Sequence, residues 1–230
     1  MRVDAMPSGE AGPLEKNLFG AALPEGLTVA WAAIPALQKP LFCEEWVMVG
    51  SSAPKRQREF IAGRVLARQM QERRGFAVSP LINGGDRAPR WPTAVCGSIS
   101  HTNDICGVAI GARRHIRSVG LDIETVGRVT PQLWPQVFTD REILNLRALG
   151  ETARAIAATS LFCAKESFYK LQYPLTGQWV GFQDAEVELL DDREFTIAIS
   201  KALPGMTDCY RGSFDRPTDD TVASLLVLPV

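Results

Sequence analysis

Hydrophobic residues alternate with small or polar residues in several short segments of the chain, a pattern typical of β-strands. These segments end at turn-forming residues, as in the TND stretch that separates residues 97–102 from 105–112. We predict strands at 27–34, 97–102, 105–112, 117–126 and 222–229, and a β-hairpin over 185–200.

Longer segments with helical character lie between these strands. The segment 54–75 begins with Pro54 and ends at Gly75, the residue types that favour the start and the end of a helix. Two more helices are predicted over 139–150 and 151–173. The chain therefore alternates strands with helices, which predicts a fold of mixed α and β structure.

The order of the elements divides the chain into two lobes. A strand, a long helix and two strands come first, and a strand, helices and further strands follow. We place the lobes at residues 1–116 and 117–230, and we find no sequence repeat between them. The first 26 residues are rich in Gly, Pro and Ala and predict a tail with some extended chain.

Composition narrows the class of protein. The 230 residues are 46% hydrophobic and carry a formal net charge of −1, so nucleic acid is not an expected partner. Five widely spaced cysteines without a C-x-x-C pair indicate neither a disulfide framework nor a zinc site. No apolar run approaches the ~20 residues that span a bilayer, and the N-terminus lacks the apolar core of a signal peptide. We expect a cytoplasmic protein.

Two acids stand out in the strand-like stretch SVGLDIE. Because side chains alternate along a strand, Asp122 and Glu124 share one face, and Leu121 and Ile123 share the other. Two carboxylates this close repel each other unless a cation compensates them, and Mg²⁺ or Mn²⁺ suits oxygen ligands. Alone, the pair is more typical of the solvated face of an edge strand than of a metal site.

A third acid lies in the helical segment FCAKESFYK. Glu166 shares a helix face with aromatic residues and with Lys170, so its charge requires a partner or a metal. One explanation of this pattern is an ordinary surface ion pair between Glu166 and Lys170. Together with Lys165, however, the segment also suits an anionic ligand that binds with a metal.

The helix over 54–75 is strongly basic. Most of its charges suit a solvated face, but Arg64 and Arg68 fall within the apolar stripe of the helix. Each of these arginines either extends to solvent, pairs with a buried acid or points into a cleft. The following loop adds Arg87 and Arg90, and guanidinium groups bind phosphate well.

His101 is a further candidate for phosphate binding. His101 ends the strand-like GSISHT segment, where an imidazole can donate to a phosphate oxygen, although a lone histidine is more often structural. The sequence contains no G-x-S-x-G, P-loop or G-x-G-x-x-G motif, which argues against a serine hydrolase and the common nucleotide-binding folds.

Three ordered blocks together resemble the signature of a known family. They are WP…GSISHT (91–102), VGLDIE (119–124) and LFCAKESFYK (161–170). In this order they resemble the 4′-phosphopantetheinyl transferases of the larger, single-chain type. The segments KRQREFIAGRVLAR and DRAPRWP resemble further blocks of that family.

The resemblance implies a fold, a reaction and partners. The fold would be two pseudo-symmetric α/β lobes, each a small antiparallel sheet with a long helix, with coenzyme A (CoA) in the cleft between them. The reaction would transfer the 4′-phosphopantetheine group of CoA to a serine of an apo acyl or peptidyl carrier protein, with Mg²⁺ or Mn²⁺ as cofactor. Adenosine 3′,5′-bisphosphate would be released, and we expect a monomer.

The resemblance also implies roles for individual residues. The metal ligands would be Asp122, Glu124 and Glu166. The catalytic residues would be Glu166, Lys170 and His101, with Glu166 as metal ligand, general base or both. The residues that bind CoA would be Arg56, Arg64, Arg87, Arg90, Ser100, His101, Lys165 and Lys170.

Two other functions fit the same residues. A metal-dependent phosphodiesterase would use water as the nucleophile and would hydrolyse a nucleotide without labelling a protein. A non-catalytic module that binds CoA or a carrier would keep its function after Glu166→Gln. The three acids together favour the transferase.

Overall fold

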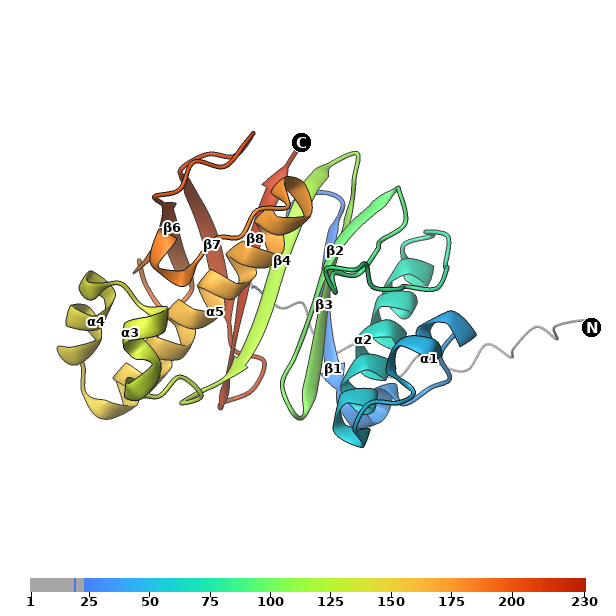
Figure 1. The fold of residues 1–230 in the computed structure, drawn as a ribbon, viewed down its shortest axis with the longest axis horizontal. Coiled ribbons are helices and arrows are strands. Elements are labelled where there is room, and N and C mark those ends of the chain that lie inside the picture. The colour runs from blue at the N-terminus through green and yellow to red at the C-terminus, as the bar shows by residue number, and fades with distance from the viewer. Residues whose placement is uncertain (1–18, 20–22) are drawn as a thin grey trace, which may run out of the picture.

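The computed structural model describes Phe19 and residues 23–230. Over these residues the chain forms two antiparallel sheets, each covered by one long helix (Figure 1). The mixed α and β fold is therefore confirmed. Most of the predicted N-terminal tail lies outside the described residues.

The first sheet has three strands in the order β1–β3–β2. The elements in chain order are β1 (Leu27–Ala33), a 3₁₀ turn (Ile34–Leu37), α1 (Cys43–Val49), α2 (Pro54–Arg73), β2 (Val95–His101) and β3 (Ile105–Ala112). Helix α2 packs on this sheet through a core that includes Leu66, Met70, Val108 and Ile110. This packing places the basic helix across β3, the central strand of the first sheet.

The second sheet has five strands in the order β4–β8–β7–β6–β5. Its strands are β4 (Ile116–Thr125), β5 (Ala185–Leu189), β6 (Glu194–Ile199), β7 (Cys209–Asp215) and β8 (Thr221–Pro229). The helices are α3 (Trp134–Val137), α4 (Asp140–Arg147) and α5 (Glu151–Thr176), with short 3₁₀ turns at Pro131–Leu133 and Phe182–Asp184. Helix α5 crosses β4 and β8 and buries Phe168 and Leu171.

The predicted strands and long helices are confirmed, with bounds shifted by a few residues. The helices α1 and α3 were not predicted, because they have only seven and four residues. Strand β7 was not predicted either, because Gly212 interrupts its alternation of apolar residues. Gly212 is needed there because a Cβ atom would lie 2.2 Å from the Phe195 ring. Helix α5 extends past the predicted end at 173 and includes Pro174 in its last turn.

The two sheets meet where β2 lies beside β4 (Figure 1). Strand β3 also approaches β4, where a glycine permits the close contact: a Cβ atom at Gly107 of β3 would lie 2.3 Å from Ile123 Cδ1. At Gly120 of β4, a Cβ atom would lie 1.8 Å from the carbonyl oxygen of Ser167, so α5 also approaches β4 closely. Strand β4 is therefore enclosed by α5 and by the first sheet.

None of the helices in the described part of the chain has the length and apolar character needed to cross a bilayer.

Candidate active site

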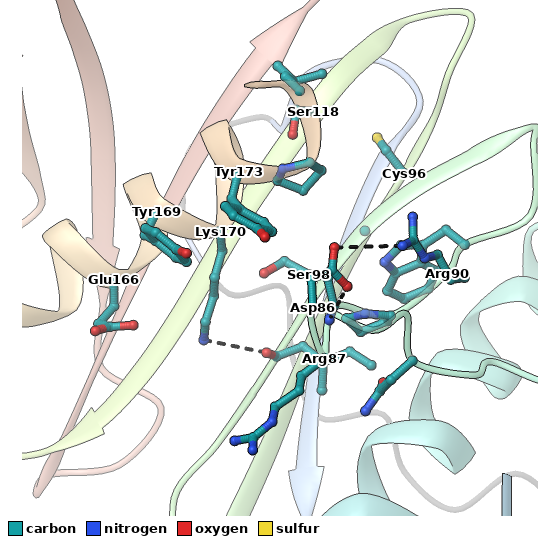
Figure 2. A pocket seen from close by; sticks show the side chains of 18 of the residues that line it. Asp86, Arg87, Arg90, Cys96, Ser98, Ser118, Glu166, Tyr169, Lys170 and Tyr173 are labelled. Atoms are coloured by element: carbon teal, nitrogen blue, oxygen red, sulfur yellow. Dashed lines mark hydrogen bonds and ion pairs between the residues drawn. The ribbon is translucent and has the colours of Figure 1, made fainter. Parts of the chain in front are cut away.

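A cavity of about 730 Å³ opens between the two sheets. One wall comes from α2, β2 and the loop over residues 83–91, and the other comes from α5 and the start of β4. Figure 2 shows Glu166, Tyr169 and Lys170 projecting from α5, with Arg87 and Arg90 on the loop opposite. The predicted site residues that line the cavity are Arg56, Arg64, Arg87, Arg90, His101, Glu166 and Lys170.

Asp122 and Glu124 are buried rather than solvated. Their exposed fractions are 3% and 8%, although β4 is an edge strand of its own sheet. The interpretation as a solvated face is therefore wrong, because the first sheet and α5 cover the strand. Burial of two carboxylates is costly unless other groups compensate their charge.

Asp122 is compensated through one of its two oxygens. Oδ1 accepts hydrogen bonds from Lys170 Nζ at 2.7 Å and from Ser100 Oγ at 2.8 Å. Oδ2 is buried without a hydrogen-bond partner, and so is Glu124 Oε2, whose nearest cation is Arg128 in a 3.4 Å ion pair. Two carboxylate oxygens are thus unsatisfied at adjacent positions of one strand face.

The electrostatics reflect this crowding of acids. Burial, reinforced by the charge of Asp122, raises the pKa of Glu124 to about 7. The same two causes raise the pKa of Glu166 on the opposite helix. Burial alone would lower the pKa of Lys170, but Asp122 and Glu166 outweigh it and raise this pKa. Additional positive charge beside these acids would therefore be favourable.

These residues fit a hard divalent cation. The donors are carboxylate oxygens, two of them buried and unsatisfied, which is the ligand type of Mg²⁺ and Mn²⁺. No group of three or more His, Cys, Asp or Glu side chains within the described residues is itself arranged to hold a metal. A bound cation would complete its shell with oxygens from substrate and water, as Mg²⁺ commonly does.

The two arginines in the apolar stripe of α2 have different environments. Arg64 is buried, stacks 3.9 Å above the Phe60 ring and donates to the Leu81 carbonyl. Burial lowers its pKa to about 10, so it stays charged at neutral pH. Arg68 pairs with the buried carboxylate of Glu45 at 3.0 Å and does not line the cavity. Of these two arginines, only Arg64 lines the cavity and is available to a ligand.

His101 lies in the cavity wall between opposite charges. Its Nε2 is 3.3 Å from an Arg56 nitrogen and 3.9 Å from a Glu59 oxygen. Burial lowers the pKa of His101, and the positive charge of Arg56 acts in the same direction against Glu59. A neutral imidazole beside Arg56 can exchange hydrogen bonds with a phosphate.

Comparison with known proteins identifies the family. Residues 44–111 match the family model of the 4′-phosphopantetheinyl transferase N-terminal domain, and residues 118–217 match that of the 4′-phosphopantetheinyl transferase superfamily. The 4′-phosphopantetheinyl transferase Svp of Streptomyces mobaraensis is 34% identical over 192 residues, 82% of this chain and 78% of its own. The chain belongs to the 4′-phosphopantetheinyl transferase superfamily.

Other relatives of this phosphopantetheinyl transferase family member are similar over shorter regions. PptT of Mycobacterium tuberculosis is 32% identical over 158 residues, 65% of either chain. Enterobactin synthase component D of Escherichia coli K12 is 32% identical over 64% of this chain and 71% of its own. Thermotoga maritima holo-[acyl-carrier-protein] synthase superposes with a TM-score of 0.39 at 22% identity, over 48% of this chain and 61% of its own.

The structure does not bring every predicted residue of this family member to the cavity. Lys165 is buried on another side of α5, where Nζ contacts Glu142 at 2.7 Å and the carbonyl oxygens of Val137 and Phe182. An ammonium group has three hydrogens, and these three acceptors match them. Ser100 is buried against Asp122 and does not line the cavity.

Part of the cavity wall comes from residues that the sequence pattern did not single out. Arg113, in the turn between β3 and β4, and Arg117, at the start of β4, line the cavity together with Asn83 of the opposite loop. The only signal was the basic RRHIR stretch between two predicted strands. Tyr173, one turn from Tyr169 and stacked on it, also lines the cavity.

Proposed function

We propose that this family member transfers the 4′-phosphopantetheine group of CoA to a serine of an apo carrier protein, in a Mg²⁺-dependent reaction that releases adenosine 3′,5′-bisphosphate. The observation that carries the proposal is the cavity. It joins Glu166 and Lys170 of α5 to arginines of the opposite wall. Asp122 and Glu124 do not line it themselves, but Lys170 connects its wall to the buried Asp122 through their ion pair.

The cavity suits CoA in size and charge. Its volume of about 730 Å³ lies in the usual range of small-molecule sites. CoA carries a pyrophosphate and a 3′-phosphate, and the cationic side chains on both walls suit these groups. We assign the phosphates to Arg56, Arg64, Arg87 and Arg90, with His101 as a further partner.

Asp122, Glu124 and Glu166 would hold the divalent cation. When bound, it would neutralise charge that develops on the pyrophosphate. The unsatisfied oxygens of Asp122 and Glu124 and the raised pKa values of Glu124 and Glu166 support this assignment.

The remaining chemistry is positioning and proton transfer. The carrier serine Oγ attacks the β-phosphorus, and the bond from that phosphorus to the bridging oxygen breaks. Adenosine 3′,5′-bisphosphate then leaves with the bridging oxygen. The serine proton passes to Glu166, whose raised pKa makes it a better base than an ordinary carboxylate. Lys170, held by Asp122 at the cavity wall, stabilises negative charge on the transferred group.

We further propose that residues 1–116 and 117–230 are the two lobes, with CoA in the cleft between them. The division falls after Ile116, the first residue of β4, so each lobe keeps its own sheet except for this one residue. The five cysteines are free thiols, which is compatible with a location of the protein in the reducing cytoplasm.

The test is incubation with CoA, Mg²⁺ and purified apo carriers from fatty-acid, polyketide and nonribosomal-peptide systems. The expected result is a mass gain on a carrier equal to one phosphopantetheine group. Asp122→Ala, Glu124→Ala and Glu166→Gln should each lower the rate at least about 100-fold, whereas the exposed Arg141→Ala should not. Hydrolysis of CoA without a labelled carrier would contradict the proposal.

A further inference from the structure

Strand β4 is hydrogen-bonded to another strand along one edge only. It pairs with β8, while its other edge faces β2 of the three-stranded sheet. Within the described residues, β2 and β4 form no backbone ladder. The free edge must nevertheless satisfy buried backbone groups, because unpaired ones are costly.

Two serine side chains of β2 take the place of the missing ladder. The N–H of Leu121 donates to Ser98 Oγ at 3.0 Å, and the N–H of Ile123 donates to Ser100 Oγ at 3.1 Å. Both serines are buried, with 5% and 6% of their surface exposed. They therefore make the same structural contribution at neighbouring positions of the two strands.

The hydroxyl hydrogens of the two serines go to different acceptors. Ser98 donates to the carbonyl oxygen of Leu121 at 3.2 Å, so its contacts are all with backbone. Ser100 donates to Asp122 Oδ1 at 2.8 Å, next to Lys170. Since a hydroxyl has a single hydrogen, Ser100 cannot donate to Asp122 and to a phosphate at the same time.

We propose that Ser100 is a positioning residue that holds the Asp122 carboxylate through Oδ1 and leaves Oδ2 free to ligate the divalent cation. The proposal rests on the proposed function, and it replaces the contact with CoA that the sequence analysis assigned to Ser100. Holding one oxygen of a ligating carboxylate typically affects metal affinity by about 10-fold to 100-fold. The serine thus links the first sheet to the metal ligands of the second.

The test compares Ser100→Ala with Ser98→Ala, which loses an equivalent contact to a β4 N–H but leaves Asp122 untouched. Mn²⁺ binding is measured without CoA, from the electron paramagnetic resonance signal of the free ion. We expect Ser100→Ala to bind Mn²⁺ at least about 10-fold more weakly than the wild-type protein, and Ser98→Ala to stay within about twofold. Ser100→Thr keeps the hydroxyl and should recover most of the affinity.

Binding of adenosine 3′,5′-bisphosphate in the presence of EDTA separates the two roles of Ser100. We expect Ser100→Ala to bind the bisphosphate with the same affinity as the wild-type protein. Weaker binding of the bisphosphate with unchanged Mn²⁺ affinity would assign Ser100 to the substrate and overturn the proposal.

Carrier labelling by the wild-type protein in the Mn²⁺ buffer separates this proposal from the proposed function. Labelling, combined with equal Mn²⁺ affinities of the two alanine variants, would overturn the role of Ser100 alone. The absence of both labelling and Mn²⁺ binding would overturn both proposals.

Discussion

Lys170 Nζ lies 2.7 Å from Asp122 Oδ1, and this ion pair joins the long helix α5 to the first strand of the five-stranded sheet. The aspartate is buried, while the lysine side chain is 27% exposed at the cavity wall. Lys170 therefore lies between the buried acids and the space that a ligand would occupy. The stability of this arrangement and its binding capacity depend on the same contact.

Removing the lysine should destabilise the fold. Lys170→Met leaves the buried charge of Asp122 without its cation, which costs about 3–5 kcal/mol when both partners are fully buried. Because Lys170 is partly exposed, we expect a loss of about 2 kcal/mol in the free energy of unfolding. Urea denaturation at pH 7 without divalent cations measures this loss. The exposed Lys39→Met is the matched control, and equal stability of the two variants would contradict the prediction.

Glu124 should make stability fall as the pH rises. Its pKa is about 7 in the folded protein against a reference value of 4.5, so the folded state binds its proton more tightly than the unfolded state. The folded state is therefore favoured at low pH, and this advantage is lost progressively between pH 4.5 and 7.

The substitution Glu124→Gln removes this titration. We expect the variant to be more stable than the wild-type protein by about 2 kcal/mol at pH 8, with a much smaller difference at pH 5. Urea denaturation in EDTA at both pH values measures the difference. The exposed Glu188→Gln serves as the control. A stability difference that does not depend on pH would argue against a raised pKa of Glu124.

Much of the fold could be predicted because local signals coincide with the elements. The strands of the first sheet alternate and end at turns, and α2 begins at a proline. In contrast, the approach of the first sheet to β4 has no local signal, because it depends on two serine side chains of β2 and on Gly107 of β3 rather than on a backbone ladder. This is why the burial of Asp122 could not be predicted.

Spacing also explains which lysine reaches the cavity. Lys165 and Lys170 are five residues apart, which separates them by about 140° around a helix of 3.6 residues per turn. Both could not face the same ligand on a straight helix. The family resemblance assigned both to CoA, whereas helix geometry selects Lys170, the neighbour of Glu166 at i+4.

Lys165 should matter for stability but not for binding. Its three acceptors include the buried carboxylate of Glu142, so Lys165→Met leaves an uncompensated buried charge. We expect a loss of about 3–5 kcal/mol in the free energy of unfolding. Calorimetry at a temperature where the variant is folded should give an unchanged CoA affinity. A CoA affinity at least tenfold weaker in the folded variant would return Lys165 to the binding site.

Gly120 should be intolerant of any side chain because α5 passes directly over it. A Cβ atom there would lie 1.8 Å from the Ser167 carbonyl oxygen and 2.9 Å from the Leu171 nitrogen, which are backbone atoms that cannot rotate away. We expect Gly120→Ala to cost about 3 kcal/mol or more in the free energy of unfolding, measured by urea denaturation. Because Ser167 follows Glu166, displacing the helix from β4 should also lower carrier labelling by the folded fraction.

Gly150→Ala is the control, because a Cβ atom there would meet nothing within 4 Å, and it should cost less than about 1 kcal/mol in the free energy of unfolding. Equal stabilities of the two variants would show that α5 and β4 are not in close backbone contact at this point.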